Sequence, residues 1–212
     1  MDAVDQLAVR STYHHGDLRR ALLDAGITLA REGGPDAVVL REATRRAGVV
    51  PNAAYRHFAS REALLQAVRA AALAALAVAM ETELAGLRGR RPADRARASL
   101  RAIGTGYLRF AQEETGLFRT AFAVPDQVEN DSDPAKAGPS GLNPFQLLGT
   151  ALDRLVAARV LPAERRGGAE YLAWSAVHGL ALLVIDGPLR GVAPAQRQAL
   201  GQRLLDMVEK GL

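Results

Sequence analysis

The chain has 212 residues, of which 49% are hydrophobic and 24% charged, with a formal net charge of +4. Such a chain has enough apolar residues for one large or two modest globular domains. It contains no cysteine, which excludes disulfides and thiolate zinc sites within it and agrees with a cytoplasmic location. We see no run of 18 apolar residues and no apolar core of a secretory signal in residues 1–10, so we expect no membrane association.

The periodic segments are helical, and no stretch alternates as a strand does, so the sequence predicts an all-α fold. The first helix is expected from about Asp17 to Glu32, where leucines and an alanine recur along one face. The Gly-Gly-Pro run at residues 33–35 should end it, because glycine and proline interrupt helices.

Residues 40–58, LREATRRAGVVPNAAYRHF, predict two short helices around a glycine turn. Gly48 follows an Arg-rich helical run and can take the left-handed conformation that ends a helix. Pro51 suits the first position of the next helix, because its φ is already helical and its missing N–H is not needed there. Small residues let the two helices cross closely, and Phe58 anchors the second. This is the form of a helix-turn-helix, whose second helix enters the major groove of DNA.

Ser60 is expected to cap a long fourth helix that continues to about residue 87. After a basic link at residues 88–92, we expect helices at about 93–112, 115–123, 144–160, 163–185 and 194–210. Residues 124–144 hold four prolines among Asp, Asn, Ser and Gly, a composition typical of a mobile loop. The predicted organisation is a DNA-binding domain at 1–62, a linking helix at about 60–87 and a helical domain at 88–212.

Positive charge is concentrated near the N-terminus, where residues Arg10 to Ala70 include 10 arginines and 6 acidic residues. This favours an anionic partner at that end, with an ordinary solvated surface as the alternative. Arg10 and Tyr13 precede the first helix and form either a flexible tail or an arm along the DNA backbone. Arg41 and Arg45 lie beside the groove-reading helix, where clustered arginines favour phosphate contact.

Seven of the ten aromatic residues fall between Tyr107 and Trp174, which suggests a cavity for an apolar small molecule, with ordinary core packing as the alternative for each of them. His178 lies one helical turn beyond Trp174 on the same face. It would either polarise a ligand or be a structural histidine with its hydrogen bonds made within the protein. The predicted ligand-binding residues are Tyr107, Phe110, Phe118, Phe122, Phe145, Tyr171, Trp174 and His178.

The last two helices carry more apolar residues than the edge of a small domain usually exposes. A twofold homodimer would bury this surface and place two reading helices about one DNA turn, ~34 Å, apart, to match a palindromic site. Packing within one chain is the alternative. The apolar residues are Leu172, Val177, Leu180, Leu183, Val184, Leu200, Leu204 and Val208.

The strings YHHGDLRRALLDAG, LREATRRAGV, YRHF and SREAL, in this order between Tyr13 and Ala67, resemble the DNA-binding domain of the TetR-type transcriptional regulators. The likeness runs in outline over the whole chain, and residues 174–179, WSAVHG, are similar to a Trp and His-Gly signature of one C-terminal subfamily. The resemblance implies a three-helix DNA reader tied by a long helix to a ligand-sensing, dimerising domain, which usually acts as a repressor.

The resemblance also implies residue roles: Tyr55 and His57 lie where phosphate is usually contacted, and Arg61 where a basic residue usually is. Val39 and Val50 depart from the family, which often has a capping Ser or Thr at these positions; each missing cap costs about 1 kcal/mol. The predicted DNA-binding residues are Arg10, Tyr13, Arg41, Arg45, Val50, Pro51, Asn52, Ala53, Tyr55, Arg56, His57 and Arg61.

The sequence therefore predicts a sequence-specific regulator that binds double-stranded DNA as a homodimer and is released by a largely apolar small molecule. A sequence-blind architectural DNA-binding protein is the first alternative. An enzyme with His178 as base and Asp186 or Glu170 as its partner is the second, although no nucleophile elbow, phosphate loop or cofactor fingerprint is present. No metal and no cofactor are expected.

Overall fold

The computed structural model describes residues 15–88, 91–125, 128 and 130–212, without the side chains of residues 15–17 and Pro51. The predicted contacts of Arg10 and Tyr13 lie outside these residues. Every regular element within the described ranges is helical, which confirms the predicted all-α fold.

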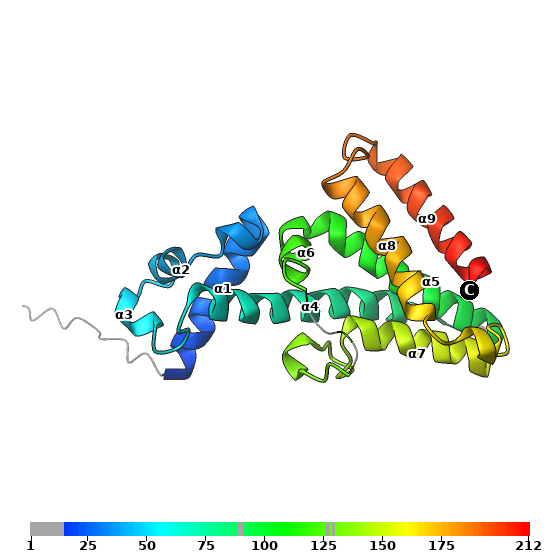
Figure 1. Cartoon of the computed structure of the whole chain (residues 1–212), viewed down its shortest axis with the longest axis horizontal. Coiled ribbons are helices and arrows are strands. Elements are labelled where there is room, and N and C mark those ends of the chain that lie inside the picture. The colour runs from blue at the N-terminus through cyan, green and yellow to red at the C-terminus, as the bar shows by residue number, and fades with distance from the viewer. Residues whose placement is uncertain (1–14, 89–90, 126–127, 129) are drawn as a thin grey trace, which may run out of the picture.

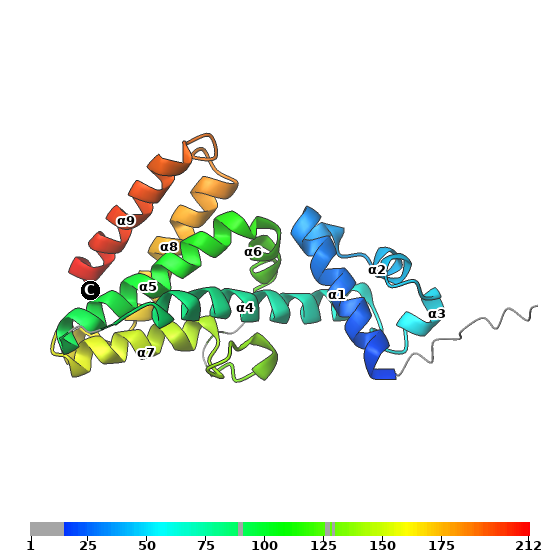
Figure 2. The same cartoon turned by 180° about the vertical axis from the view of Figure 1, so that it is seen from behind.

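The chain forms two groups of helices joined by one long helix (Figure 1). The first group and the long helix are α1 (His15–Gly33), α2 (Leu40–Arg46), α3 (Pro51–Ala54) and α4 (Arg61–Ala85). The second group is α5 (Pro92–Glu113), α6 (Thr115–Ala121), α7 (Pro144–Ala157), α8 (Ala169–Ile185) and α9 (Pro194–Gly211). Short 3-10 turns lie at Pro35–Ala37, Pro134–Lys136 and Ala163–Arg165. Figures 1 and 2 show α1–α3 at one end of α4, with α3 farthest from the second group.

Helix α4 is the structural spine of the protein. The predicted cap is confirmed, since the Ser60 Oγ accepts a hydrogen bond from the Ala63 N–H at 3.2 Å. Contrary to our expectation, α4 is long and apolar enough to cross a membrane. However, half of its most apolar window is buried, because α4 packs against α1, α5, α6 and α7. This is the pattern of a core helix in a globular protein.

Helix α3 is shorter than the helix predicted from the sequence. It ends at Ala54, and residues 55–57 form a turn in which the N–H groups of His57 and Phe58 both donate to the Ala54 carbonyl at 2.9 Å. Phe58 nevertheless takes its predicted place as the buried anchor after this helix.

The helix expected at 163–185 is also divided. It begins only at Ala169, because Gly168 before it takes a left-handed φ of 75°.

The loop predicted at 124–144 is more structured than its composition suggested. Lys136 pairs with Asp131 at 2.6 Å, and the Asn143 Nδ2 donates to the Asp131 carbonyl at 2.9 Å. On α4, the Glu81 Oε1 accepts from the Ser140 N–H at 3.0 Å. The bond to Glu81 joins residues 59 apart in the sequence, so local composition alone could not reveal it.

Helix α6 lies directly against the C-terminal end of α1. A Cβ atom on Gly116 would be 2.2 Å from the Ala30 carbonyl oxygen and 2.4 Å from that of Arg31, so only glycine fits. The Arg31 Nε also donates to Glu114, just before α6, at 3.0 Å. On its other side, α6 is joined to the end of α8 by the ion pair between Arg119 and Asp186. Helix α6 thus connects the two groups of helices independently of α4.

We expect Gly116→Ala to lower the free energy of unfolding by about 1–3 kcal/mol, because the methyl group would overlap backbone oxygens that cannot move freely. Urea denaturation would measure the change. Gly167→Ala is the matched control, because no atom lies within 4 Å of its added Cβ. Equal stability of the two variants would contradict the close packing of α6 on α1.

Candidate DNA interface and ligand cavity

The turn between α2 and α3 has the predicted geometry. Gly48 adopts a left-handed φ of 67°, and the N–H of Val49 donates to the Thr44 carbonyl at 3.0 Å, closing the end of α2. Val49 is partly buried and packs on the core. Val39 and Val50 precede α2 and α3 without any side-chain cap, as the sequence indicated.

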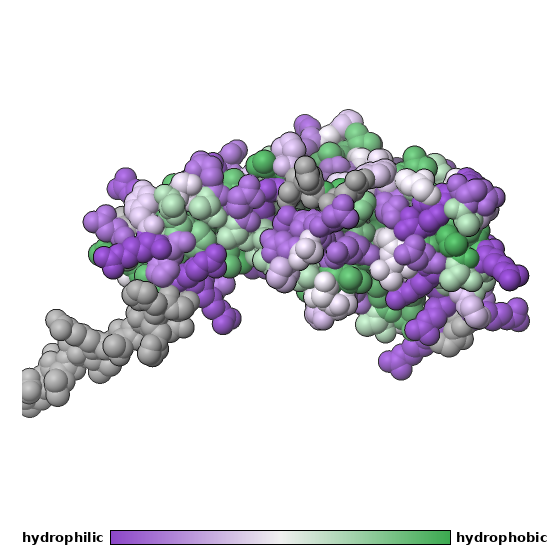
Figure 3. Space-filling view, turned by 60° about the horizontal axis from the view of Figure 1, so that its bottom comes forward, coloured by the Kyte–Doolittle hydropathy of each residue, from purple (hydrophilic) through white to green (hydrophobic). Residues whose placement is uncertain are grey.

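The outer face of α3 and its following turn is open to solvent. Val50 is 69% exposed and Tyr55 58%, and both Asn52 and Arg56 are exposed. Ala53 and His57 are half-buried, and Pro51 begins the helix. The inner face is held by buried Ala54 and by Phe58, whose ring lies 5.0 Å from the Arg19 guanidinium. In the space-filling view, hydrophilic and apolar residues are both exposed at this end of the molecule (Figure 3). An outward face on a firmly held short helix is what entry into a groove requires.

The arginines of α2 differ in their availability. Arg46 pairs with Glu32 of α1 at 2.6 Å and with Glu42 at 3.2 Å, so it ties α1 to α2. Arg45 pairs with Glu42 at 2.6 Å but keeps 71% of its side chain exposed. Hydrogen bonds from Arg45 and then Arg46 lower the pKa of Glu42 to about 2. Arg41 is exposed and forms no ion pair with any residue in the described ranges. Arg41 is therefore the arginine of α2 most accessible to phosphate.

Arg61 has a structural position that its predicted phosphate contact did not anticipate. Its Nε donates to the Val38 carbonyl at 2.9 Å, and its Nη2 donates to the Pro35 carbonyl at 2.9 Å. The side chain thereby fastens the connection between α1 and α2 to the first turn of α4. A phosphate contact by Arg61 stays a prediction.

A cavity of about 450 Å³ lies between α4, α5, α7, α8 and α9, with the end of α6 at its border. Five of the predicted ligand-binding residues line it: Tyr107, Phe122, Phe145, Trp174 and His178. The other three do not. Phe110 and Phe118 are buried in the core, and Tyr171 packs on Phe145 from outside with ring centroids 5.8 Å apart.

Large aliphatic side chains from the helices form much of the remaining wall and were not predicted to do so. A helical stripe of leucine and valine looks the same whether it faces a filled core or a cavity, so the sequence offered no signal. These residues are Leu73, Met80, Leu100, Ile103, Leu148, Val177, Leu205 and Val208.

The charged residues of the wall have partners within the protein. Arg69 donates to the Val124 carbonyl at 2.8 Å, Lys136 pairs with Asp131, and Arg101 pairs with Asp206 and Glu209 of α9. The cavity is therefore apolar over most of its surface, and its charged side chains are bonded to other groups of the protein.

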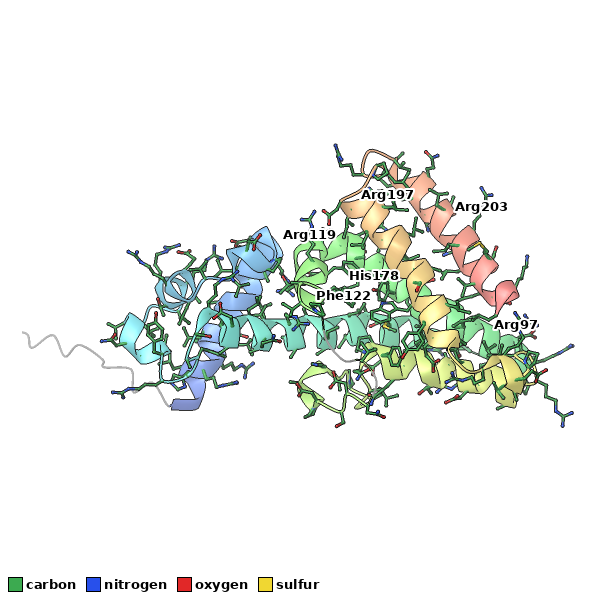
Figure 4. The ribbon with its side chains drawn as sticks, viewed as in Figure 1. Arg97, Arg119, Phe122, His178, Arg197 and Arg203 are labelled. Carbon is green, nitrogen blue, oxygen red and sulfur yellow. The ribbon has the colours of Figure 1, made fainter. Side chains whose placement is uncertain are left out.

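A hydrogen-bonded group of three side chains forms the polar part of the wall. The Trp174 Nε1 lies 3.1 Å from the Tyr107 hydroxyl, which lies 2.7 Å from the His178 Nδ1. Burial raises the pKa of Tyr107, an effect that the Trp174 hydrogen bond partly opposes, and burial lowers the pKa of His178. Both side chains are therefore neutral near pH 7. The rings of Phe122 and His178 lie 4.8 Å apart between α6 and α8 (Figure 4).

Helix α8 is apolar on both its inner and its outer face. Val177 and Val184 are buried against the body, whereas Leu172 is 67% exposed and Leu183 44%. The predicted apolar stripe therefore divides into two faces. Gly179, on this helix, would accept a Cβ with no atom within 4 Å.

Family models match both parts of the chain. Residues 22–68 match the model described as bacterial regulatory proteins, tetR family. Residues 100–208 match the model described as tetracyclin repressor-like, C-terminal domain. No curated protein sequence matches the chain.

Solved structures have a similar fold. A protein of unknown function from Rhodococcus sp. RHA1 is 26% identical with a TM-score of 0.74, covering 96% of this chain and 99% of its own. FadR from Bacillus subtilis, in complex with stearoyl-CoA, is 13% identical with a TM-score of 0.64, covering 91% and 98%. PfmR from Thermus thermophilus is 20% identical with a TM-score of 0.55, covering 90% and 98%. The last two show a shared fold alone.

We expect Arg61→Ala to lower the free energy of unfolding by about 1–2 kcal/mol, because two carbonyl groups lose a charged donor. Arg41→Ala is the control and should change the stability by less than about 0.5 kcal/mol, since this side chain is exposed and unpaired among the described residues. Urea denaturation would compare the two. If Arg61→Ala is as stable as Arg41→Ala, the carbonyl contacts do not support the fold.

Proposed function

Since the chain belongs to the TetR family of bacterial regulatory proteins, we propose that it is a ligand-responsive repressor that binds a palindromic operator as a homodimer. Occupation of the cavity by a small molecule would release the operator. The domain at 1–62 would read the DNA, and the helical domain at 88–212 would sense the ligand. The linking helix would couple the two. The proposed location is the cytoplasm, where operator and effector are both accessible.

The exposed face of α3 supports the proposed reading of DNA. Asn52 is exposed where a side-chain amide can form paired hydrogen bonds with adenine. Tyr55, Arg56 and Arg41 are exposed around it, where they would contact phosphates and set the register on the duplex.

The position of α6 supports the proposed coupling and is the observation that carries the proposal. Phe122, directly after α6, borders the cavity, and Gly116 near the start of α6 contacts the backbone of α1. A ligand that displaces Phe122 would therefore move the helix on which α1 rests. A coupling of about 1–3 kcal/mol changes DNA affinity 5- to 150-fold.

The cavity supports a largely apolar effector. Its volume of about 450 Å³ lies within the range of about 300–1,000 Å³ for small-molecule sites, and most of its wall is aliphatic or aromatic. FadR from Bacillus subtilis holds stearoyl-CoA in the same fold, so the fold can accommodate an apolar chain.

The outer face of α8 supports the proposed homodimer. A helix that is apolar on all sides normally has neighbours on all sides, yet Leu172 and Leu183 face outward here. A twofold axis along this face would bury both residues, and Gly179 would let the two α8 helices approach closely.

The side chains considered for catalysis do not meet. Asp186 pairs with Arg119, and Glu170 pairs with Arg166 at 2.7 Å, so neither orients His178. The family and the geometry point to regulation in place of an acid–base reaction.

We expect the protein to bind a palindrome from the region upstream of its own coding sequence about 10³-fold or more tighter than random DNA at equal salt. Fluorescence anisotropy with labelled duplexes would measure both affinities. Binding no tighter than to random DNA would contradict sequence-specific reading, and would favour an architectural DNA-binding protein.

Two variants separate the predicted roles within the same assay. Asn52→Ala should change the preference for one base pair by about 1–3 kcal/mol, because it removes a base contact. Arg41→Ala should weaken binding to all sequences alike and reduce the slope of log affinity against log salt by about one. Identical effects of both variants would refute these roles.

We expect Leu172→Glu to convert the dimer to monomer, because it would place two carboxylates in an apolar interface. Analytical ultracentrifugation would measure the mass in solution. Val78→Glu is the control, since Val78 is 45% exposed on α4 and away from this face, and it should stay dimeric. A dimeric Leu172→Glu protein would show that α8 is not the interface.

A further inference from the structure

We propose that the effector is a neutral apolar molecule with a hydrogen-bond acceptor oxygen, such as a ketone, ester or lactone, and that the Nε2–H of His178 binds this oxygen. The role as effector rests on the proposed function. The binding chemistry itself follows from the hydrogen bonds among Trp174, Tyr107 and His178.

The first hydrogen bond has only one possible direction. The indole Nε1–H of Trp174 can donate but cannot accept. At 3.1 Å from the Tyr107 oxygen, it therefore donates to that oxygen, which acts as an acceptor. The hydroxyl proton of Tyr107 must then point to another group.

The second hydrogen bond determines where that proton goes. Tyr107 is only 4% exposed, and burial raises the pKa of its hydroxyl, so it keeps its proton. Within the described part of the chain, its hydrogen-bond partners are Trp174 and the His178 Nδ1 at 2.7 Å. Because Trp174 cannot accept, Tyr107 donates to the Nδ1. With a proton on the Nδ1, the Tyr107 hydroxyl would be a buried donor without an acceptor.

His178 is thereby held as the tautomer with its proton on the Nε2. Burial keeps the ring neutral, and a neutral imidazole that accepts at the Nδ1 must donate at the Nε2. The Nε2 forms no hydrogen bond with any residue in the described ranges, and His178 borders the cavity. The rings of Phe122, Phe118 and Trp174 surround it, with centroids 4.8, 5.6 and 6.0 Å away.

Two of the three basic side chains of the wall are already held in ion pairs, and the third, Arg69, donates to Gln66 and to the Val124 carbonyl. Lys136 is paired with Asp131, and Arg101 with Asp206 and Glu209, so binding an anion there would require breaking ion pairs. A ligand ammonium would place its own N–H donors against the Nε2–H of His178. A neutral molecule with an acceptor oxygen satisfies the donor and leaves its apolar surface for the aliphatic wall.

The tautomer can be tested without any ligand. Nitrogen-15 NMR of the full-length protein labelled at histidine distinguishes protonated from unprotonated ring nitrogens, and four histidines give a simple spectrum. At pH 7 we expect the His178 Nδ1 to be unprotonated and the Nε2 protonated, with the signals assigned by their loss in His178→Gln. In Tyr107→Phe the Nδ1 loses its donor, and both tautomers should appear. A protonated Nδ1 in the unsubstituted protein would overturn the proposal.

Ligand chemistry can be tested with a matched pair of probes, cyclohexyl methyl ketone and 1-cyclohexylethylamine, which carry an acceptor oxygen or an ammonium on the same skeleton. We expect the ketone to bind and to shift the His178 Nε2–H signal, and the amine not to bind. His178→Gln, which keeps a side-chain N–H donor, should retain ketone binding, whereas His178→Leu should weaken it about tenfold. Calorimetry would measure all four affinities.

Failure to bind the ketone, equal binding of the amine, or equal ketone affinity of His178→Leu and His178→Gln would overturn the inferred ligand chemistry. These measurements involve no DNA. If the ketone binds as expected but no palindrome is recognised, the proposed regulator fails alone. If the palindrome is recognised but the amine binds as well as the ketone, the ligand chemistry fails alone.

Discussion

The contact between α6 and α1 at Gly116 is the constraint on which the arrangement of the two helical groups depends. No side chain fits between α6 and the last carbonyl groups of α1, so the two backbones touch. Phe122, directly after this short helix, lies in the cavity wall, and Arg119 within the helix pairs with Asp186 at the end of α8. In the proposed coupling, a change in the shape of the cavity would reach α1 through α6, with α4 as a second, parallel connection.

The residues that resemble the Trp and His-Gly signature have a shared physical basis. Trp174 and His178 lie one helical turn apart, so both reach the Tyr107 hydroxyl from the inner side of α8. Gly179 follows directly and has open space around it. One short segment thus contributes the polar part of the cavity and, in the proposed dimer, would let the partner helix approach closely.

Local chemistry in the sequence predicted the elements well. Ser60 as a cap and Gly48 in a left-handed turn each depend on neighbours within a few residues, and both occur as expected. The contacts that were missed are non-local: Arg61 reaches carbonyl groups 23 and 26 residues away, and Glu81 binds a loop 59 residues away.

The candidate cavity shows the same limit of sequence-based prediction at the end of α6. Phe118 and Phe122 are four residues apart and equally aromatic, yet Phe118 is fully buried and only Phe122 borders the cavity. Spacing identifies the face of a helix, but not whether that face meets side chains or empty space. The enrichment of aromatic residues therefore located the cavity, and the structure was needed to select its walls.

Trp174 is the only tryptophan in the chain, and its indole is in the polar wall of the cavity. Excitation near the red edge of the indole absorption band would therefore produce fluorescence from this one side chain, without an attached dye. Because the indole N–H is bonded to Tyr107, the emission maximum would report the polarity of that small region. The protein thus carries its own optical reporter.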